Sequence, residues 1–309
     1  MEKALVTGGA GFIGSNIVEL LVEKGIETVV LDSMYLGDES NLEEVREDIN
    51  IIDGSVLNEE DLEKAVKGCD TIFHMAARSS SPMHKQDAAK GARVNLEGFI
   101  NTVEAAKEEG AEKIVYASTS SMYGSVKPPH QEHIDVEPVN LYTASKMSRE
   151  MYARSYSYQE DIHTTGLRFF SVYGPHEKAK GEYANVVTQF LWKMQNNEQP
   201  VIWGDGTQER DFVFVKDVAR ANIKAAERRE ELDGEVFNIG TGDPTTFNEV
   251  VEHLNKKLGK EIEPEKIENP RDKYVHEHKA DISKAREVLG WKPQNDFEQG
   301  LKKTVDFYS

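Results

Sequence analysis

Short apolar segments alternate with longer amphipathic segments through the first half of the 309-residue chain. The predicted strands are residues 4–7, 28–31, 50–52, 71–74, 113–117 and 164–168, and the predicted helices are residues 13–24, 59–66, 88–109 and 141–158. Repeated strand-helix units are typical of a parallel sheet, because each strand must return to the same edge through a crossover. Right-handed crossovers then place helices on both faces. The pattern predicts an α/β fold with a doubly wound parallel sheet.

After Arg168 this regularity weakens. Gly/Pro turns such as Gly174-Pro175 and Gly204-Asp205-Gly206 indicate loops rather than a new periodic architecture. We expect residues 1–168 to form the sheet domain, with later segments near residues 211–242 returning to it, and residues 169–309 to form mainly a smaller lobe.

A glycine-rich turn, residues 8–14, joins the first predicted strand to the first helix. Glycine permits unusual dihedrals and close backbone approach there, so a diphosphate can lie on the helix N-terminus. Asp32 ends the second strand, where a carboxylate hydrogen-bonds a ribose diol and repels a 2'-phosphate. No Arg or Lys follows it before Arg46. The turn predicts a Rossmann-type NAD site, and a purely structural turn is the alternative.

Tyr142 and Lys146 begin another predicted helix and share one of its faces. A free tyrosine, with a pKa of about 10, is a poor base at neutral pH. A nearby ammonium and a positive nicotinamide ring stabilise the phenolate. Hydroxyls of residues 118–121 end the preceding strand, where one can hydrogen-bond the reacting oxygen. Taken alone, such a pair is most often a surface contact, but its position after a dinucleotide turn and these hydroxyls predicts proton transfer on a substrate hydroxyl.

The net charge of -18 argues against nucleic acid and anionic membranes as partners. A phosphorylated ligand would need arginines and helix N-termini as a local positive site. Cys69 is the single cysteine, which excludes an intrachain disulfide and favours a reducing compartment. A strand begins near residue 3 and no apolar run is long enough to span a membrane, so we expect a cytoplasmic protein. His74, and the pair His276 and His278, lack a full ligand set, and we expect no metal.

Taken together, these blocks resemble the extended short-chain dehydrogenase/reductases, specifically the NAD-dependent sugar-nucleotide epimerases and dehydratases. The resemblance covers essentially the whole chain, with the blocks in the same order. They are the glycine turn, residues 73–77, 118–124, the Tyr-x-x-x-Lys pair, and residues 167–175, 204–212 and 238–242.

The resemblance implies a role for each matching residue. Tyr142 would be the base, Lys146 its modulator and ribose anchor, and Thr119 the hydroxyl partner. The implied NAD contacts are Gly8, Gly11, Phe12, Ile13, Gly14, Asp32, Ser55, Val56, Ala76, Tyr142 and Lys146. The implied substrate contacts are Thr119, Ser120, Tyr142, Ser171, Arg210, Arg271 and His278. Of these, Arg210 and Arg271 would hold the substrate diphosphate, and His278 would set the room for the sugar substituents.

Departures from the family pattern narrow the chemistry. The 4,6-dehydratases carry Asp-Glu directly after the Thr119 position, and uronate decarboxylases carry Glu two residues after it, whereas this chain has Ser120 and Ser121. Ser171 replaces the usual Asn beside the substrate diphosphate. Ser55 replaces an adenine-contacting Asp and leaves Val56 as the adenine wall.

We therefore expect C4 epimerisation of a UDP-hexose, such as UDP-glucose with UDP-galactose, through a transient 4-keto sugar. The alternatives are a UDP-glucuronate or UDP-N-acetylhexosamine 4-epimerase, a nucleotide-sugar dehydratase or reductase, and a non-catalytic NAD-sensing protein. The resemblance also implies a homodimer, formed by the helix near residues 88–109 and the helix that carries Tyr142.

Overall fold

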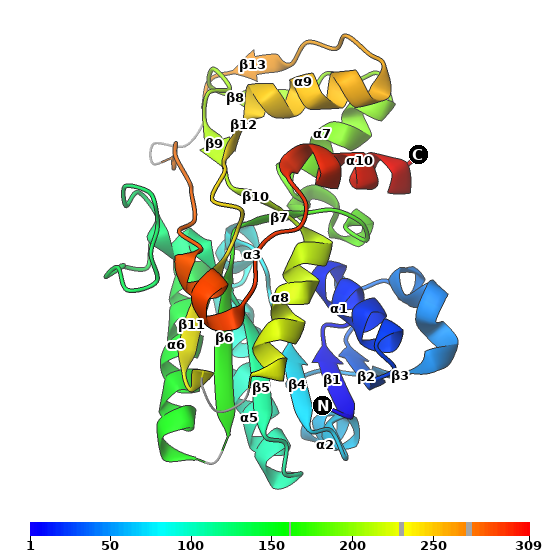
Figure 1. Ribbon diagram of the computed structural model, residues 1–309, viewed down its shortest axis with the longest axis vertical. Helices are drawn as coiled ribbons and strands as arrows, with labels where there is room; N and C mark the ends of the chain where they lie inside the picture. Colours follow the sequence, from blue (N-terminus) through cyan, green and yellow to red (C-terminus); the bar gives the residue numbers. More distant parts are fainter. Residues whose placement is uncertain (161, 229–231, 270–273) are drawn as a thin grey trace.

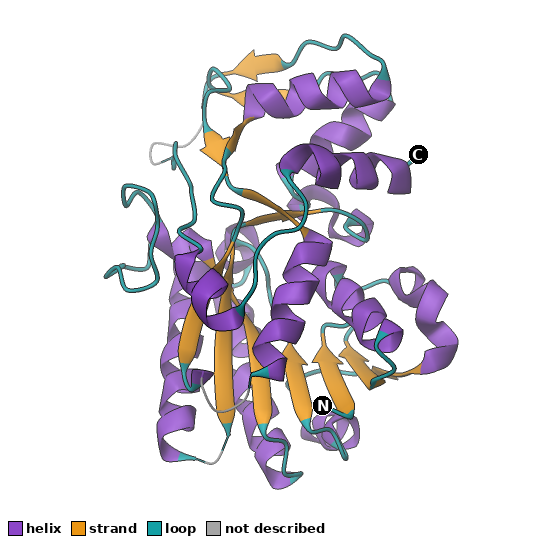
Figure 2. Ribbon diagram, in the orientation of Figure 1, coloured by secondary structure: helices purple, strands orange, loops and turns teal. Residues whose placement is uncertain are grey.

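The computed structural model describes residues 1–160, 162–228, 232–269 and 274–309. Within these residues, seven parallel strands form the central sheet, in the order β11-β6-β5-β4-β1-β2-β3 (Figures 1 and 2). Their bounds are Lys3–Thr7 (β1), Glu27–Asp32 (β2), Ile49–Asp53 (β3), Thr71–His74 (β4), Lys113–Thr119 (β5), His163–Phe169 (β6) and Glu235–Ile239 (β11). The predicted doubly wound α/β fold is confirmed.

Alternation along the buried strands gives the sheet two apolar faces. In β1, Ala4 and Val6 belong to one buried cluster, and Leu5 belongs to the other. The first cluster includes residues of α1 (Phe12–Glu23) and α8 (Val215–Glu227), and the second includes residues of α2 (Glu59–Val66), α5 (Gly98–Glu108) and α6 (Leu141–Gln159). Because consecutive side chains point to opposite faces, each of β1 to β5 contributes to both layers.

The predicted helix of residues 88–109 is a chain of shorter pieces. It contains α4 (Ala88–Ala92), a π-helical turn η2 (Arg93–Glu97) and α5, and it is preceded by α3 (Ser81–Gln86). A π turn widens the helix locally and often occurs at functional sites. Here the turn carries the fully buried Asn95, whose side chain hydrogen-bonds backbone atoms of Arg78 and the Ser145 hydroxyl.

The second half of the chain is more regular than the sequence suggested. It forms α8 and three helices of the upper lobe, together with short strand pairs (Figure 1). The lobe elements are β7 (Ser171–Tyr173), α7 (Val186–Gln195), β8 (Val201–Trp203), β9 (Glu209–Arg210), β10 (Phe212–Phe214), β12 (Thr245–Thr246), α9 (Phe247–Leu258), β13 (Glu265–Ile267) and α10 (Phe297–Phe307). The turns Gly174-Pro175 and Gly204-Asp205-Gly206 lie in loops, as expected, after β7 and between β8 and β9, whereas the helices of the lobe were not predicted.

One buried carboxylate fixes the lobe to the edge of the sheet. Asp211 accepts hydrogen bonds from the amides of Thr241, Gly242 and Ala280 at 2.6–2.9 Å. It follows Arg210, so the same contacts fix the position of β9.

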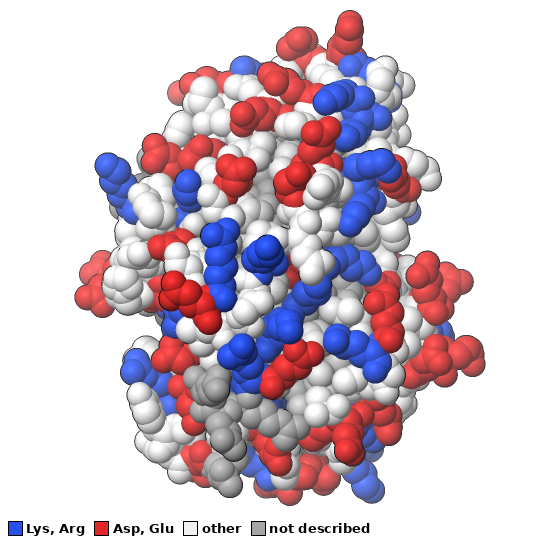
Figure 3. All heavy atoms as spheres, in the orientation of Figure 1, with Lys and Arg blue, Asp and Glu red and all other residues white. Residues whose placement is uncertain are grey.

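Charge is spread widely over the surface. On the face shown in Figure 3, acidic side chains lie over both the sheet domain and the lobe. In the described part of the chain, no helix has the length and apolar character needed to cross a membrane.

Candidate active site

A cavity of about 400 Å³ opens at the carboxyl ends of β1, β2 and β4. Parallel sheets bind ligands at this edge, where the crossovers diverge. The cavity is lined by every predicted NAD contact except Tyr142 and Lys146, namely Gly8, Gly11, Phe12, Ile13, Gly14, Asp32, Ser55, Val56 and Ala76. The structure therefore brings together residues from four separate segments of the sequence.

The glycine turn is packed too closely for larger residues. A Cβ on Gly14 would lie 2.1 Å from the Gly8 oxygen, and Gly8 itself has a φ of +68°. Gly11 caps α1 without a side-chain hydrogen bond, and no acidic residue lies in the first turn of the helix. Its amide N–H groups and positive dipole end can therefore receive an anionic group.

Asp32 is held rigidly at the end of β2. Its carboxylate accepts from the amides of Ala10 at 3.0 Å and Met34 at 2.9 Å. Burial raises the pKa of Asp32, and these backbone donors oppose that rise. The carboxylate thus has a fixed position in the wall of the cavity.

A capping box begins α6 at Asn140. The Asn140 side chain accepts from the Thr143 amide at 2.9 Å, and the Thr143 hydroxyl accepts from the Asn140 amide at 3.1 Å. This cap places Tyr142 in the first helical turn, as predicted from the sequence. Lys146 follows one turn later, with its ammonium 5.9 Å from the centre of the Tyr142 ring.

The Tyr142 hydroxyl meets the end of β5. Its side chain hydrogen-bonds that of Thr119, whose Oγ1 also accepts from the Ser121 amide at 3.1 Å. Burial raises the pKa of Tyr142, and both the Thr119 hydrogen bond and the charge of Arg149 oppose the rise. Burial, reinforced by Arg149, holds the pKa of Lys146 well below its ordinary value.

His278 lies in an aromatic group next to the same strand end. Its ring is 4.7 Å from that of Phe170 and 5.0 Å from that of His130, and its Nε2 is 3.3 Å from the Ser120 carbonyl oxygen. Burial, together with the charges of His130 and Arg210, lowers the pKa of His278 to about 3. A neutral His278 therefore donates through Nε2 to Ser120.

The remaining predicted substrate residues lie in the lobe. Arg210 is half-buried, with its guanidinium 5.7 Å from the Phe247 ring and 5.2 Å from the Tyr274 ring. Ser171 is half-buried at the start of β7, and its amide donates to the Asp211 carbonyl at 3.0 Å. Arg271 lies outside the described residues.

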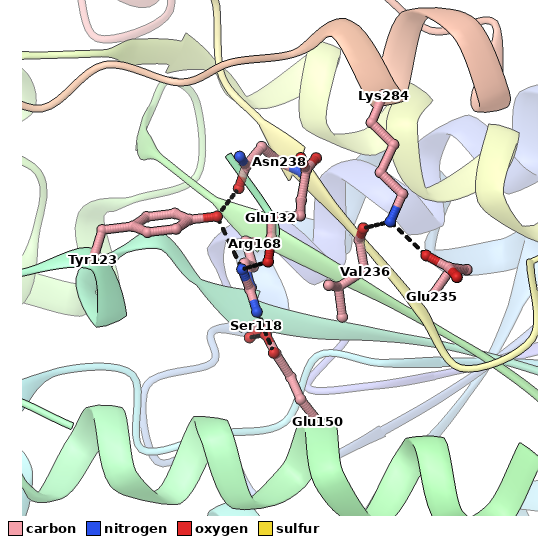
Figure 4. A network of polar contacts seen from close by, with 9 residues as sticks. All are labelled: Ser118, Tyr123, Glu132, Glu150, Arg168, Glu235, Val236, Asn238 and Lys284. Atoms are coloured by element: carbon pink, nitrogen blue, oxygen red, sulfur yellow. Dashed lines mark hydrogen bonds and ion pairs between the residues drawn. The ribbon is translucent and has the colours of Figure 1, made fainter. Parts of the chain in front are cut away.

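A polar network connects the ends of β5 and β6 to α6 (Figure 4). Arg168 donates to both carboxylate oxygens of Glu150, at 3.0 and 2.7 Å, and to the Tyr123 hydroxyl at 2.9 Å. Glu150 also accepts from the Ser118 hydroxyl at 2.5 Å. The network thus fixes the residue that directly precedes Thr119.

Comparisons with known proteins agree with this geometry. Residues 4–240 match the pattern of the NAD dependent epimerase/dehydratase family. The chain belongs to this family. It is 31% identical to UDP-glucuronate 4-epimerase of Thermodesulfobacterium geofontis, over 99% of this chain and 96% of that protein.

Solved structures show the same relationship. UDP-glucose 4-epimerase of Thermotoga maritima, determined with UDP-glucose, superposes with a TM-score of 0.92 at 36% identity, over 99% of this chain and 98% of that one. UDP-N-acetylglucosamine 4-epimerase of Methanobrevibacter ruminantium M1, determined with UDP-N-acetylmuramic acid, superposes with a TM-score of 0.93 at 32% identity, over 99% and 98%. The protein is therefore an NAD-dependent enzyme of the sugar-nucleotide 4-epimerase type, and the predicted cofactor is confirmed.

The groups that line the cavity match the chemical groups of NAD, independently of the comparisons. The glycine turn leaves room that a Cβ would fill, the N-terminus of α1 offers uncapped amides, and Asp32 presents a fixed carboxylate. These are the groups that a diphosphate and a ribose diol require.

Several cavity residues were not predicted from the sequence, among them Lys180, Arg78 and Tyr35. Lys180 comes from the 3-10 helix η4 (Lys178–Tyr183) of the lobe, and Arg78 and Tyr35 come from loops after β4 and β2. The Arg78 guanidinium lies 3.6 Å from the centre of the Tyr35 ring. No local spacing connects these residues, so only the fold reveals their shared location.

Proposed function

We propose that the enzyme catalyses reversible epimerisation at C4 of a UDP-hexose, with UDP-glucose and UDP-galactose as its substrates. The observation that carries this proposal is the contact between Tyr142 and Thr119, beside Lys146 and next to two serines. This arrangement can move one proton on one hydroxyl. Neither Ser120 nor Ser121 offers the carboxyl group that elimination of water needs. The 36% identity to an epimerase determined with UDP-glucose supports the choice of sugar.

Proton transfer in this scheme begins at the Tyr142 oxygen. As a phenolate, Tyr142 accepts the proton of the C4 hydroxyl, and the Thr119 hydroxyl donates a hydrogen bond to the reacting oxygen. NAD, when bound, supplies a reversible acceptor for the C4 hydride and a positive ring beside Tyr142. Tyr142 later returns the proton to the same oxygen. Because the hydride would return to C4 on the opposite face of the sugar, the cycle would invert C4 with no net redox change.

Epimerisation also requires the 4-keto sugar to turn while its nucleotide stays fixed. We assign the nucleotide anchor to Arg210, with Arg271 as the second arginine expected from the resemblance. The buried Asp211 fixes the backbone beside Arg210. In this proposal residues 1–168 hold NAD, and the lobe of residues 169–309 mainly holds the substrate.

The test is turnover of a panel of UDP-sugars, with product chromatography. We expect interconversion of UDP-glucose and UDP-galactose, and a loss of about 10²–10⁴-fold in kcat for Tyr142→Phe. Tyr152→Phe is the matched control, because Tyr152 lies on the same helix and is 47% exposed. Full activity in Tyr142→Phe would disprove the assigned base. Conversion only of UDP-glucuronate or UDP-N-acetylhexosamines would reassign the sugar, and an absorbing 4-keto product or net NADH consumption would indicate a dehydratase or reductase.

We also propose that the enzyme is a homodimer through α5 and α6. Large apolar side chains are exposed on α6, including Met151 at 71% and Tyr158 at 72%. Met151→Asp should shift the mass measured by light scattering from dimer to monomer. Phe307→Asp, at an apolar position 48% exposed on α10, should leave the mass unchanged. A wild-type monomer would refute the proposal.

A further inference from the structure

Arg149 is a fully buried cation without a carboxylate partner. Its guanidinium donates to the Asn95 carbonyl at 2.9 and 2.6 Å and to the Ala117 carbonyl at 3.1 Å. Among the described residues, no acidic side chain forms an ion pair with it. Arg168 nearby shows the usual solution, a bidentate pair with Glu150. An unpaired buried charge is costly, so its presence calls for a reason other than stability.

The position of Arg149 points toward the reacting end of α6. Tyr142, Lys146 and Arg149 follow one another at four- and three-residue spacing and therefore lie on one face of the helix. Helical side chains lean toward the N-terminus, which is the end that carries Tyr142. The Ala117 carbonyl receives both the Lys146 ammonium at 3.0 Å and the Arg149 guanidinium at 3.1 Å. Two cations thus meet at one atom of β5, two residues before Thr119.

We propose that Arg149 is a positioning residue whose fixed charge stabilises the phenolate of Tyr142. The proposal rests on the proposed function, in which Tyr142 is the base. Lys146 shares a buried site with a second cation, and an ammonium under such conditions loses its proton readily. A guanidinium keeps its charge through the neutral range. Arg149 therefore supplies a positive charge near Tyr142 that persists when Lys146 loses its proton. Lys146 can then exchange hydrogen bonds with ligands.

The electrostatics agree with this geometry. The charge of Arg149 lowers the pKa of Tyr142, and Tyr142 in turn raises that of Arg149. Burial lowers the pKa of Arg149 to about 10, which still leaves it protonated at neutral pH. Burial and Arg149 together lower the pKa of Lys146 well below its ordinary value.

The other groups around this site cannot replace Arg149. On α6, Glu150 is bound to Arg168 and Ser118. On α3, the His84 ring meets Tyr142 at 5.4 Å, and burial lowers its pKa. On β4, the buried His74 has a pKa well below its ordinary value, through burial and the nearby cations. The neutral hydroxyl groups from β5 are those of Tyr116 and Thr119. Both histidines are thus neutral when Tyr142 ionises.

The experiment measures the ionisation of Tyr142 in Arg149→Met, Arg149→Lys and Arg154→Met. Ultraviolet difference titration of the NAD-loaded protein without substrate reports phenolate formation, with the same variants in a Tyr142→Phe background as blanks. A charge about two helical turns away should shift the Tyr142 pKa by about one unit. We expect this rise in Arg149→Met, and also in Arg149→Lys, because a buried ammonium beside Lys146 would lose the charge that a guanidinium keeps. Arg154 is exposed on the same helix, and its replacement should have no effect.

The pH profile of kcat provides the second readout. In Arg149→Met the acidic limb of this profile should shift to higher pH by about one unit. At a fixed pH on that limb kcat should therefore fall about tenfold, and at high pH it should recover. An equal loss at every pH, or an unmoved Tyr142 titration, would overturn the proposal. If Arg149→Met does not fold, Arg149→Lys decides, because an unmoved Tyr142 titration there would overturn the proposal and a rise of about one unit would support it. The titration needs no turnover. It therefore tests the role of Arg149 even if the enzyme proves not to be a C4-epimerase, so the two failures can be told apart.

Discussion

Replacing Arg168 with Met should destabilise the enzyme more than any exposed ion pair could. The Arg168 and Glu150 side chains are 7% and 12% exposed and lie 2.7 Å apart. Removing the guanidinium leaves the Glu150 carboxylate without its bidentate partner in a poorly solvated position. The Tyr123 hydroxyl and the Glu132 carbonyl each lose a donor as well.

The size of the effect follows from the burial of this pair. Breaking a buried ion pair costs about 3–5 kcal/mol. For a chain of 309 residues, an unfolding entropy of about 2.1 cal/mol/K per residue converts this to a decrease of about 5–8 °C in Tm. Glu150→Gln combined with Arg168→Met should recover part of the loss, because the stranded charge is then removed.

Urea and thermal denaturation followed by circular dichroism measure both quantities. Lys302→Met is the matched control, since Lys302 and Asp306 lie 2.6 Å apart but are 63% and 60% exposed. An exposed pair contributes about 0–1 kcal/mol, so this variant should resemble the wild type. Equal losses in Arg168→Met and Lys302→Met would refute the argument from burial.

Two further predictions concern the cofactor and pH. Lys180→Gln should weaken NAD binding by about threefold to tenfold in calorimetric titration, because the positively charged side chain of Lys180 lines the cavity, although its ammonium also pairs with Glu177. Lys178→Gln, exposed on the same turn, should not, and equal effects would disprove a local role. For His278, the folded pKa of about 3 lies below the unfolded value of about 6.5, so unfolding takes up a proton and stability falls as pH decreases. Between pH 7 and 5, His278→Gln should remove about 2 kcal/mol of the decrease in unfolding free energy measured by urea denaturation, and a decrease equal to that of the wild type would refute the argument.

Local sequence patterns predicted the strand-helix turns of the sheet domain, because these depend on residues close together in the chain. The glycine turn, Asp32 at a strand end, and Tyr142 in the first turn of a helix all follow from residue spacing and secondary structure. The helices of the lobe were not predicted, because glycine turns such as Gly204-Asp205-Gly206, between β8 and β9, were the strongest local signals there and say nothing of the helices farther along the chain. The π turn around Asn95 was also missed, since its residues fit an ordinary helical pattern.

The electrostatics of the site could not be predicted in the same way, because charge acts according to burial and not to spacing. Arg149 sits in a helix next to Glu150, as a surface arginine would, and only the fold reveals that it is buried on carbonyl groups. Burial raises the pKa of Tyr142, so a tyrosine enclosed by the protein becomes a weaker base unless cations are enclosed with it. The chain has a net charge of -18, and the negative potential of the whole protein disfavours ionisation of a tyrosine. The cations that stabilise a phenolate must therefore come from specific buried positions. In the proposed mechanism, epimerisation at neutral pH therefore depends on the buried charge of Arg149 as directly as on the Tyr-Lys pair itself.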